Sequence, residues 1–223
     1  MTLMRGDIST GRAKNRHPLD WYVEEGWEWM QIVRAIGLVP EQEPDCYIWD
    51  PAAGYGHSAQ GLEGHGVDGR FILSDLVQNV EWDMFEVRPK FFSADFLEMD
   101  RAPIARCSIW TNPPYSYRKG ILEAYVRQAM RLATDRVVML VPLKWLAPGK
   151  KRSRLMMRDH PPQLILIFSQ RPSMPPGDRL FAMGNRAYRG GVIDYAACVW
   201  DVRQPTAPGE TRTIWLPPLE GAI

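Results

Sequence analysis

Seven short apolar runs are the feature of this 223-residue sequence that most constrains its fold. Each has about the length of a strand, and several are apolar throughout, which is typical of strands covered on both faces. The runs are 47–49, 70–73, 91–93, 107–111, 136–141, 164–168 and 195–200. In the first half of the chain they recur roughly every 20 residues, which leaves room for one crossover helix after each strand. The sequence therefore predicts an α/β fold with a mostly parallel sheet.

Helical periodicity is clearest in two segments, residues 20–36 and 119–133. Gly37 lies just past the first of them and is typical of a helix stop. Residues 147–153 and 172–191 are irregular, and a loop as long as the second one is usually functional when it lies inside a domain. We expect one domain over residues 20–202, with tails at 1–19 and 203–223 and insert loops at 144–158 and 172–191.

Composition excludes several classes of protein. Apolar residues make up 45% and charged residues 24%, as in ordinary globular proteins. Three scattered cysteines favour neither a disulfide framework nor a zinc site, and we expect no metal. There is no signal-peptide pattern and no run of 18 apolar residues, so we expect a cytoplasmic protein with no membrane association.

Charge is divided unevenly along the chain. Residues 1–110 carry 10 Lys and Arg against 18 Asp and Glu, whereas residues 111–223 carry 17 against 8. The two irregular stretches are basic, and their candidate phosphate contacts are Lys144, Lys150, Lys151, Arg152, Arg154, Arg179, Arg186 and Arg189. Such a distribution is typical of a protein that binds a polyanion, although a solvated surface gives the same pattern.

A glycine-containing loop follows the first predicted strand, in the order Asp50-Pro51-Ala52-Ala53-Gly54-Tyr55-Gly56. Gly54 and Gly56 permit a tight turn and a close approach of backbone to ligand. Asp75 ends the second predicted strand, where a carboxylate can accept hydrogen bonds from both hydroxyls of a ribose. The pair predicts a cofactor that contains a nucleoside, whereas the glycines alone would fit an ordinary turn.

Asp95 and Phe96 follow the third predicted strand. An acid and an apolar side chain at this point can hold the amino group and the ring of an adenine. An Asp in this position also commonly caps a helix.

The most specific motif is Asn112-Pro113-Pro114-Tyr115, directly after the strand 107–111. Two prolines end the strand and fix the backbone, so that carbonyls point outward. The Asn112 side-chain oxygen and the Pro113 carbonyl then form an acceptor pair beside the ring of Tyr115. This arrangement suits a planar substrate with an NH₂ group, which the acceptors bind while the tyrosine stacks on the ring.

Together the motifs at 50–56, 75, 95–96 and 112–115 resemble the S-adenosylmethionine-dependent amino-methyltransferases. They resemble most the DNA adenine-N6 group in which the cofactor motif precedes the catalytic motif. The segment that begins Asp20-Trp21-Tyr22 resembles the element that packs beside the methionine end of the cofactor. The resemblance implies a Rossmann-like sheet of seven strands in the order 3-2-1-4-5-7-6, with the last strand antiparallel.

The resemblance also implies residue roles and a reaction. Asp50 and residues 51–56 would face the methionine part, together with Tyr22. Asp75 would bind the ribose, and Asp95 and Phe96 the adenine. The motif 112–115 would bind the target amino group for direct in-line methyl transfer, on a DNA base that is flipped out or single-stranded. Only 21 residues follow Val202, so target recognition would come from the basic loops, a partner subunit or a second copy.

Three alternatives remain open. Protein glutamine methyltransferases also use this motif on an amide NH₂, although they usually carry a helical domain before the cofactor motif. Methylation of adenine in RNA would use a basic surface in the same way. A catalytically silent subunit that only binds nucleic acid is the alternative from another class.

Overall fold

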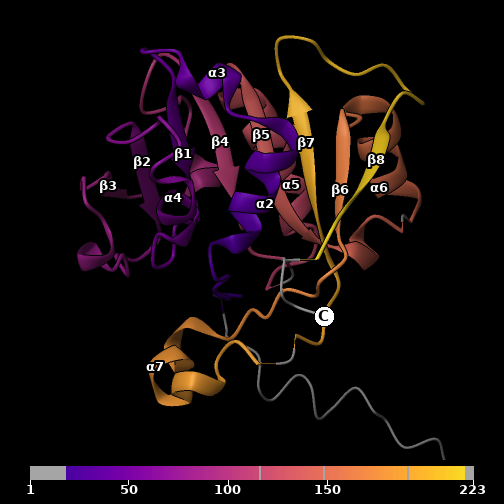
Figure 1. Cartoon of the computed structure of the whole chain (residues 1–223). Coiled ribbons are helices and arrows are strands. Elements are labelled where there is room, and N and C mark those ends of the chain that lie inside the picture. Colours follow the sequence, from indigo (N-terminus) through magenta and orange to yellow (C-terminus); the bar gives the residue numbers. More distant parts are fainter. Residues whose placement is uncertain (1–18, 116, 148, 190, 219–223) are drawn as a thin grey trace, which may run out of the picture.

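One mixed sheet of eight strands forms the centre of the molecule (Figure 1). The computed structural model describes residues 19–115, 117–147, 149–189 and 191–218. The strand order is β3-β2-β1-β4-β5-β7-β6-β8. The strands are β1 Tyr47–Asp50, β2 Phe71–Asp75, β3 Lys90–Ser93, β4 Cys107–Thr111, β5 Arg136–Pro142, β6 Leu164–Phe168, β7 Tyr195–Asp201 and β8 Arg212–Leu216.

The predicted strand order is confirmed, and the predicted number of strands is corrected. Strands β1 to β5 pair in parallel, and β7 is antiparallel to both β5 and β6. The eighth strand, β8, pairs in parallel with β6 and extends the sheet beyond it. It lies in the segment that the sequence assigns to a tail. Arg212-Thr-Ile-Trp-Leu has the β-branched and aromatic residues of a strand, and its inward Leu216 is only 3% exposed.

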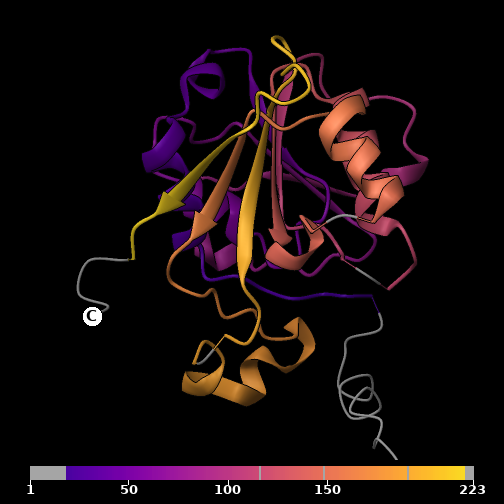
Figure 2. The same ribbon diagram turned by 90° about the vertical axis from the view of Figure 1, so that its right-hand side faces the viewer.

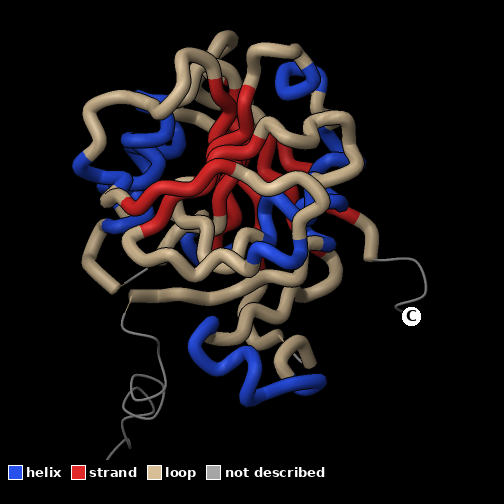
Figure 3. The backbone as a smooth tube through the Cα atoms, turned by 90° about the vertical axis from the view of Figure 1, so that its left-hand side faces the viewer, coloured by secondary structure: helices blue, strands red, loops and turns tan. Residues whose placement is uncertain are grey.

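Helices cover both faces of the sheet (Figure 3). The α-helices are α2 Trp27–Ile36, α3 Val39–Gln42, α4 His57–Leu62, α5 Ile121–Leu132, α6 Lys150–Arg154 and α7 Leu180–Met183. Side chains of α2 and α4 pack in one apolar cluster with Ile48 and Trp110, and those of α5 pack in a second with Trp49 and Ile109. Because neighbouring residues of one strand enter opposite clusters, both faces of the sheet are buried, as its apolar strands predict.

Crossover helices are fewer than the spacing of the strands suggests. After β2 and β3 the chain forms only the three-residue 3₁₀ helices η1 Trp82–Met84 and η2 Phe96–Glu98. Further short turns are η3 Leu143–Trp145, η5 Gly177–Arg179 and η6 Gly184–Arg186, and α6 continues into a π-helical turn, η4 Leu155–Asp159. Residues 150–159 are therefore helical where the sequence indicates partly irregular chain.

The helix expected over residues 20–36 begins only at Trp27. Gly26 has a left-handed φ of 91° at the helix start, and the residues before it form extended chain. This chain pairs with the long loop after β6: the Val23 amide donates to the Pro175 carbonyl (3.0 Å), and the Gly177 amide donates to the Trp21 carbonyl (3.0 Å). A tertiary pairing therefore overrides the helical periodicity of these residues.

Residues 20–25 cross beneath the edge of the sheet where the parallel strands end, as the indigo segment in Figure 2 shows. Below them, α7 and its flanking turns stand away from the body of the molecule (Figures 1 and 2). We call residues 172–191 the arm. The arm therefore lies on the same side as the loops that follow β1, β2 and β4.

Candidate functional site

The loop after β1 is shaped by two glycines in left-handed conformation. Gly54 has φ 50° and Gly56 has φ 97°. A Cβ at Gly54 would lie 2.9 Å from the Trp21 indole nitrogen, and a Cβ at Gly56 would lie 2.8 Å from the Phe85 ring. Both positions thus need glycine for conformation and for space, and the space is filled by aromatic rings of this chain.

Asp50 lies beneath this loop and is buried. Its carboxylate accepts hydrogen bonds from the Thr111 hydroxyl (2.7 Å), the Ala52 amide (3.0 Å) and the Ser58 hydroxyl. Burial raises the pKa of Asp50 to about 7, and the three hydrogen bonds oppose that shift. Asp50 therefore ties the ends of β1 and β4 together with the start of α4.

Asp75 ends β2 and faces the same loop. One carboxylate oxygen accepts from the Gly54 amide (2.9 Å) and the other from the Leu76 amide (2.7 Å). The two oxygens together offer about four lone-pair sites, so the carboxylate can still accept a hydrogen bond from a ligand hydroxyl. Burial raises the pKa of the Asp75 carboxyl, against the hydrogen bonds from the backbone amides.

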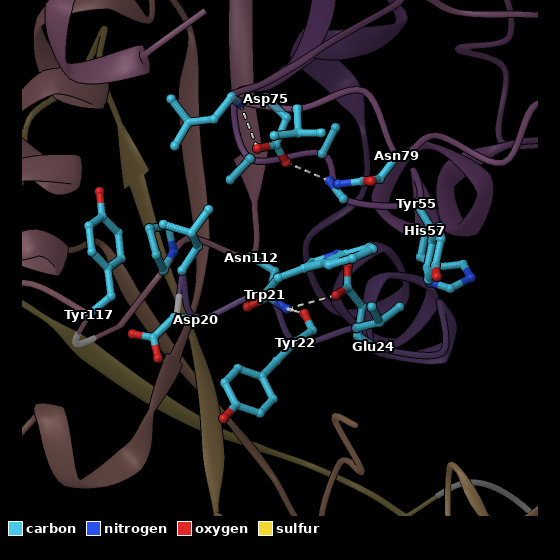
Figure 4. A pocket seen from close by; sticks show the side chains of 18 of the residues that line it. Asp20, Trp21, Tyr22, Glu24, Tyr55, His57, Asp75, Asn79, Asn112 and Tyr117 are labelled. Atoms are coloured by element: carbon cyan, nitrogen blue, oxygen red, sulfur yellow. Dashed lines mark hydrogen bonds between the residues drawn. The ribbon is translucent and has the colours of Figure 1, made fainter. Parts of the chain in front are cut away.

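The loop after β4 is held by residues distant in sequence. The Asn112 side-chain nitrogen donates to Glu24 Oε2 (2.7 Å) and to the Tyr22 carbonyl (3.2 Å), as the dashed lines in Figure 4 show. It also lies 3.8 Å from Met174 Sδ, on the arm. The Asn112 side-chain oxygen accepts from the Tyr115 hydroxyl. The amide is therefore held on both sides.

Two tyrosines lie in and just after this loop, Tyr115 and Tyr117, and they differ in exposure. The Tyr115 ring packs against Tyr195, with ring centroids 5.9 Å apart. Burial raises the pKa of the Tyr115 hydroxyl well above its usual value. Tyr117 is 38% exposed and its ring borders open space (Figure 4). Of the two, Tyr117 offers the accessible aromatic face.

These loops surround a cavity of about 270 Å³. Eight residues that the sequence analysis assigns to the site line it: Tyr22, Ala52, Ala53, Gly54, Tyr55, Asp75, Asn112 and Pro114. His57, which follows Gly56 in sequence, lines it as well. The lining also includes Asp20, Trp21, Val23 and Glu24, from the segment that the family resemblance places beside the methionine end of the cofactor. Sequence reasoning gave no such role to Leu19, Leu76, Val77, Asn79, Tyr117 and Tyr125, which line the cavity as well.

Other predicted site residues lie outside this lining. Pro51, Pro113, Gly56 and Asp50 are buried, and Tyr115 is partly buried. Phe96 is 1% exposed and packs edge-on against Trp49 (5.3 Å) in the core. Asp95 is exposed and accepts from the Leu97 amide (2.9 Å), so it caps η2.

Acidic groups dominate the polar lining of the cavity. Asp20, Glu24 and Asp75 all line it, and His57 is the one histidine among the lining residues. Burial lowers the pKa of His57, and the charge of Glu24 opposes that shift. Its Nδ1 is buried and has no hydrogen-bond partner among the described residues. The cavity thus suits a ligand that carries positive charge and hydrogen-bond donors.

The predicted phosphate contacts fall into two groups. Lys144, Lys150 and Arg154 are exposed, as are Arg179, Arg186 and Arg189 on the arm. Arg152 differs, because its Nε donates to Glu123 (2.7 Å) and its guanidinium lies over the Trp145 ring (5.4 Å). The Lys151 side chain lies outside the described residues. Arg152 is therefore held by its own fold, whereas the exposed side chains are accessible to a partner.

The described residues contain neither a cluster of metal ligands nor a membrane-spanning helix. No group of three or more His, Cys, Asp or Glu side chains there is arranged to hold a metal ion. No helix in the described ranges is long and apolar enough to cross a membrane.

The comparisons with known proteins rest on the fold. No family model matches the chain, and no curated protein matches its sequence. A provisionally assigned RNA methyltransferase from Pyrococcus horikoshii has a TM-score of 0.57 and 15% identity, over 82% of this chain and 86% of that one. A provisionally assigned class I S-adenosylmethionine-dependent methyltransferase from Listeria monocytogenes has a TM-score of 0.58 and 13% identity, over 90% and 67%.

A third similar structure is a methyltransferase subunit of a type I restriction-modification system from Streptococcus thermophilus. Its TM-score is 0.57 and its identity 10%, over 87% of this chain and 47% of that one. The strand order and these three likenesses agree. The chain therefore has the Rossmann-like fold of class I S-adenosylmethionine-dependent methyltransferases.

Proposed function

We propose that this protein transfers a methyl group from S-adenosylmethionine to the N6 amino group of adenine in DNA. The observation that carries the proposal is that Asn112, of the motif 112–115, lines the same cavity as Gly54 and Asp75. Asn112 is suited to bind an amino group, and Gly54 and Asp75 are suited to bind a nucleoside. All three line one cavity. The fold, which is that of class I methyltransferases, supports the same reaction.

The cavity fits the proposed cofactor in chemistry. Asp75 retains acceptor capacity for a ribose hydroxyl, and Gly54 brings backbone close to the space. Asp20 and Glu24 offer negative charge to a sulfonium. When bound, S-adenosylmethionine supplies an electrophilic methyl group on a positively charged sulfur.

The residues of the chain would act by binding and orientation. The Asn112 side-chain oxygen and the Pro113 carbonyl would accept the hydrogens of the target amino group, where positive charge develops during transfer. Asn112 keeps one lone pair for this purpose beside the hydrogen bond from Tyr115. The exposed ring of Tyr117 is the stacking face that we assign to the target base.

Nucleic acid would approach from the side of the arm. Arg179, Arg186 and Arg189 are exposed there, and the arm is hydrogen-bonded to residues 20–25 and contacts Asn112 through Met174. We propose that these arginines, with Lys144 and Lys150, hold phosphates while the target base is flipped out or single-stranded. A partner subunit or a second copy would complete target recognition.

The test is methyl transfer from labelled S-adenosylmethionine to DNA, RNA and release-factor protein in parallel, followed by mass spectrometry of nucleosides and peptides. We expect N6-methyladenine from DNA, and none from a matched Asn112→Ala preparation that controls for contaminating enzymes. Label in N4-methylcytosine would overturn the choice of base. Label only in RNA adenine or in protein glutamine would establish one of those activities instead. Nucleic-acid binding without any transfer would indicate a silent subunit.

A further inference from the structure

We propose that Glu24 is a positioning residue that fixes which end of the Asn112 side-chain amide acts as the acceptor. The inference rests on the proposed function, in which the oxygen of Asn112 binds the target amino group. Glu24 lies 88 residues before Asn112 in sequence, and no motif marks it. Figure 4 shows the two side chains joined across the wall of the cavity.

The orientation of this amide matters because its two ends are opposite in chemistry and nearly equal in shape. The oxygen accepts hydrogen bonds and the nitrogen donates them. An Asn112 turned by 180° would present N–H groups to the N–H groups of a target amino group, and the two would repel. A site of this kind therefore needs a partner that holds the amide one way round.

Glu24 is the strongest of the three acceptors around the Asn112 nitrogen. Its Oε2 lies 2.7 Å away, against 3.2 Å for the Tyr22 carbonyl and 3.8 Å for Met174 Sδ. Hydrogen bonds to a carboxylate are roughly twice as strong as those to a neutral acceptor. The carboxylate therefore contributes most to keeping the nitrogen on this side.

Glu24 is itself fixed in place. Its other carboxylate oxygen accepts from the Trp29 indole N–H (3.0 Å), and its backbone carbonyl accepts from the Tyr188 hydroxyl (3.4 Å). Glu24 is 6% exposed and Trp29 is fully buried. A chain of hydrogen bonds thus connects the core residue Trp29, through the Glu24 carboxylate, to the Asn112 amide.

Only a side chain with two hydrogen-bond acceptors can accept from both the Trp29 indole and the Asn112 amide. A carboxylate has two acceptor oxygens and no donor, whereas a glutamine has one oxygen and one NH₂ group. In Glu24→Gln the NH₂ group would face either the Trp29 N–H or the Asn112 nitrogen. Both arrangements place donors against each other, so the isosteric change removes the preference while it keeps the shape.

The chain offers a matched control in the next residue. Glu25 also accepts from an indole, that of Trp27 (3.2 Å), but it is exposed and does not line the cavity. Glu25→Gln makes the same chemical change one position away. It therefore separates a loss of charge near the start of α2 from a loss of the hydrogen bond to Asn112.

The primary experiment needs no enzymatic activity. The sequence contains four asparagines, at positions 15, 79, 112 and 185, so selective ¹⁵N-asparagine labelling gives four side-chain NH₂ pairs, and Asn112→Asp identifies the pair of interest. We expect Glu24→Gln to move the Asn112 pair more than the other three, because the hydrogen bond to a carboxylate is lost. Glu25→Gln should leave it in place. An Asn112 pair unchanged in Glu24→Gln would overturn the proposal.

A second variant tests the reason for the effect. In Glu24→Gln/Trp29→Phe the indole donor is gone, so the glutamine can turn its oxygen to Asn112 without meeting a second donor. We expect the Asn112 resonances to return toward their wild-type positions. If they stay where Glu24→Gln alone puts them, acceptance at both ends is not the reason for the carboxylate.

Turnover then links the geometry to the proposed function. At saturating cofactor, kcat for methyl transfer should fall at least roughly tenfold in Glu24→Gln, which is the loss expected for one hydrogen bond to a charged group, and should stay unchanged in Glu25→Gln. Unchanged turnover in Glu24→Gln would overturn the role in positioning. A wild-type protein that methylates nothing would refute the proposed function, while the resonances of Asn112 would still decide whether Glu24 holds the amide.

Discussion

Two strand-end loops meet at the cavity, and they are held in different ways. The loop at 51–56 after β1 is fixed by its own surroundings: Asp50 binds the Ala52 amide and the Ser58 hydroxyl, and Asp75 binds the Gly54 amide. The loop at 112–115 after β4 is fixed by Tyr22, Glu24 and Met174, which lie 62 to 90 residues away in sequence.

In the proposed function, the difference separates cofactor binding from methyl transfer. The first loop presents backbone and a carboxylate, whose positions follow from two neighbouring strands. The second loop presents one side-chain amide, whose orientation depends on extended chain that crosses from the N-terminal side and on the arm. Substitutions in the first loop should therefore change the affinity for a cofactor, and substitutions in the second should change turnover.

Asn112→Ala gives the largest expected effect. Because its oxygen would bind charge that develops during transfer, turnover should fall by at least roughly 10²–10³-fold, on the order of the loss when one preorganised group is removed from a transition-state site. Binding of S-adenosylmethionine should change by less than about 1 kcal/mol. Labelled-methyl transfer and calorimetry measure the two quantities, and an equal loss in both would erase the distinction between the loops.

Glu28→Gln tests the buried acid of α2, whose carboxyl is influenced by the charge of Glu24. Burial raises the pKa of Glu28 from 4.5 to about 8, so the folded protein keeps a proton that the unfolded chain releases above pH 4.5. The wild-type free energy of unfolding should therefore fall between pH 4.5 and 8 by on the order of 5 kcal/mol relative to Glu28→Gln. Urea unfolding of both proteins across this range is the measurement. Parallel curves would show that Glu28 is ionised in the folded protein.

Asp75→Ala tests the first loop. The loss of a charged acceptor should weaken cofactor binding by roughly 1.5–3 kcal/mol, and turnover at saturating cofactor should change less than in Asn112→Ala. Asp95→Ala is the matched control. Asp95 is also an acid that follows a strand, β3, but it is exposed and does not line the cavity. A larger loss from Asp95→Ala in calorimetry would place the nucleoside nearer β3, as the family resemblance implies.

The smallest effects concern the basic side chains outside both loops. If the arm holds phosphates, joint replacement of Arg179, Arg186 and Arg189 by glutamine should flatten the log–log salt dependence of duplex DNA binding by roughly 0.9 for each phosphate that these arginines neutralise. Arg152→Gln should leave this slope unchanged and lower the thermal stability, because Arg152 pairs with Glu123. Fluorescence anisotropy of labelled DNA at several salt concentrations measures the slope for the triple variant and for Arg152→Gln. A slope that depends on Arg152 alone would move the footprint to α6.

Much of the fold and one half of the site could be predicted from the sequence. Apolar runs such as 107–111 and 136–141 specified buried strands, since a strand covered on both faces has few alternatives. The order of motifs along the chain, interpreted through the family resemblance, indicated the strand order. Gly54 and Asp75 could be singled out because the roles predicted for them depend on backbone conformation and on strand ends, which are local properties.

The remaining features depend on interactions between distant segments. Residues 20–25 have helical periodicity, yet they are extended because they pair with 175–177 on the arm. The same pairing brings Glu24 to Asn112. Tyr117, rather than Tyr115, lines the cavity. The sequence determined which residues could accept an amino group and a ribose. Only the tertiary structure decided how the Asn112 amide is turned, because a hydrogen bond across 88 residues has no local signature.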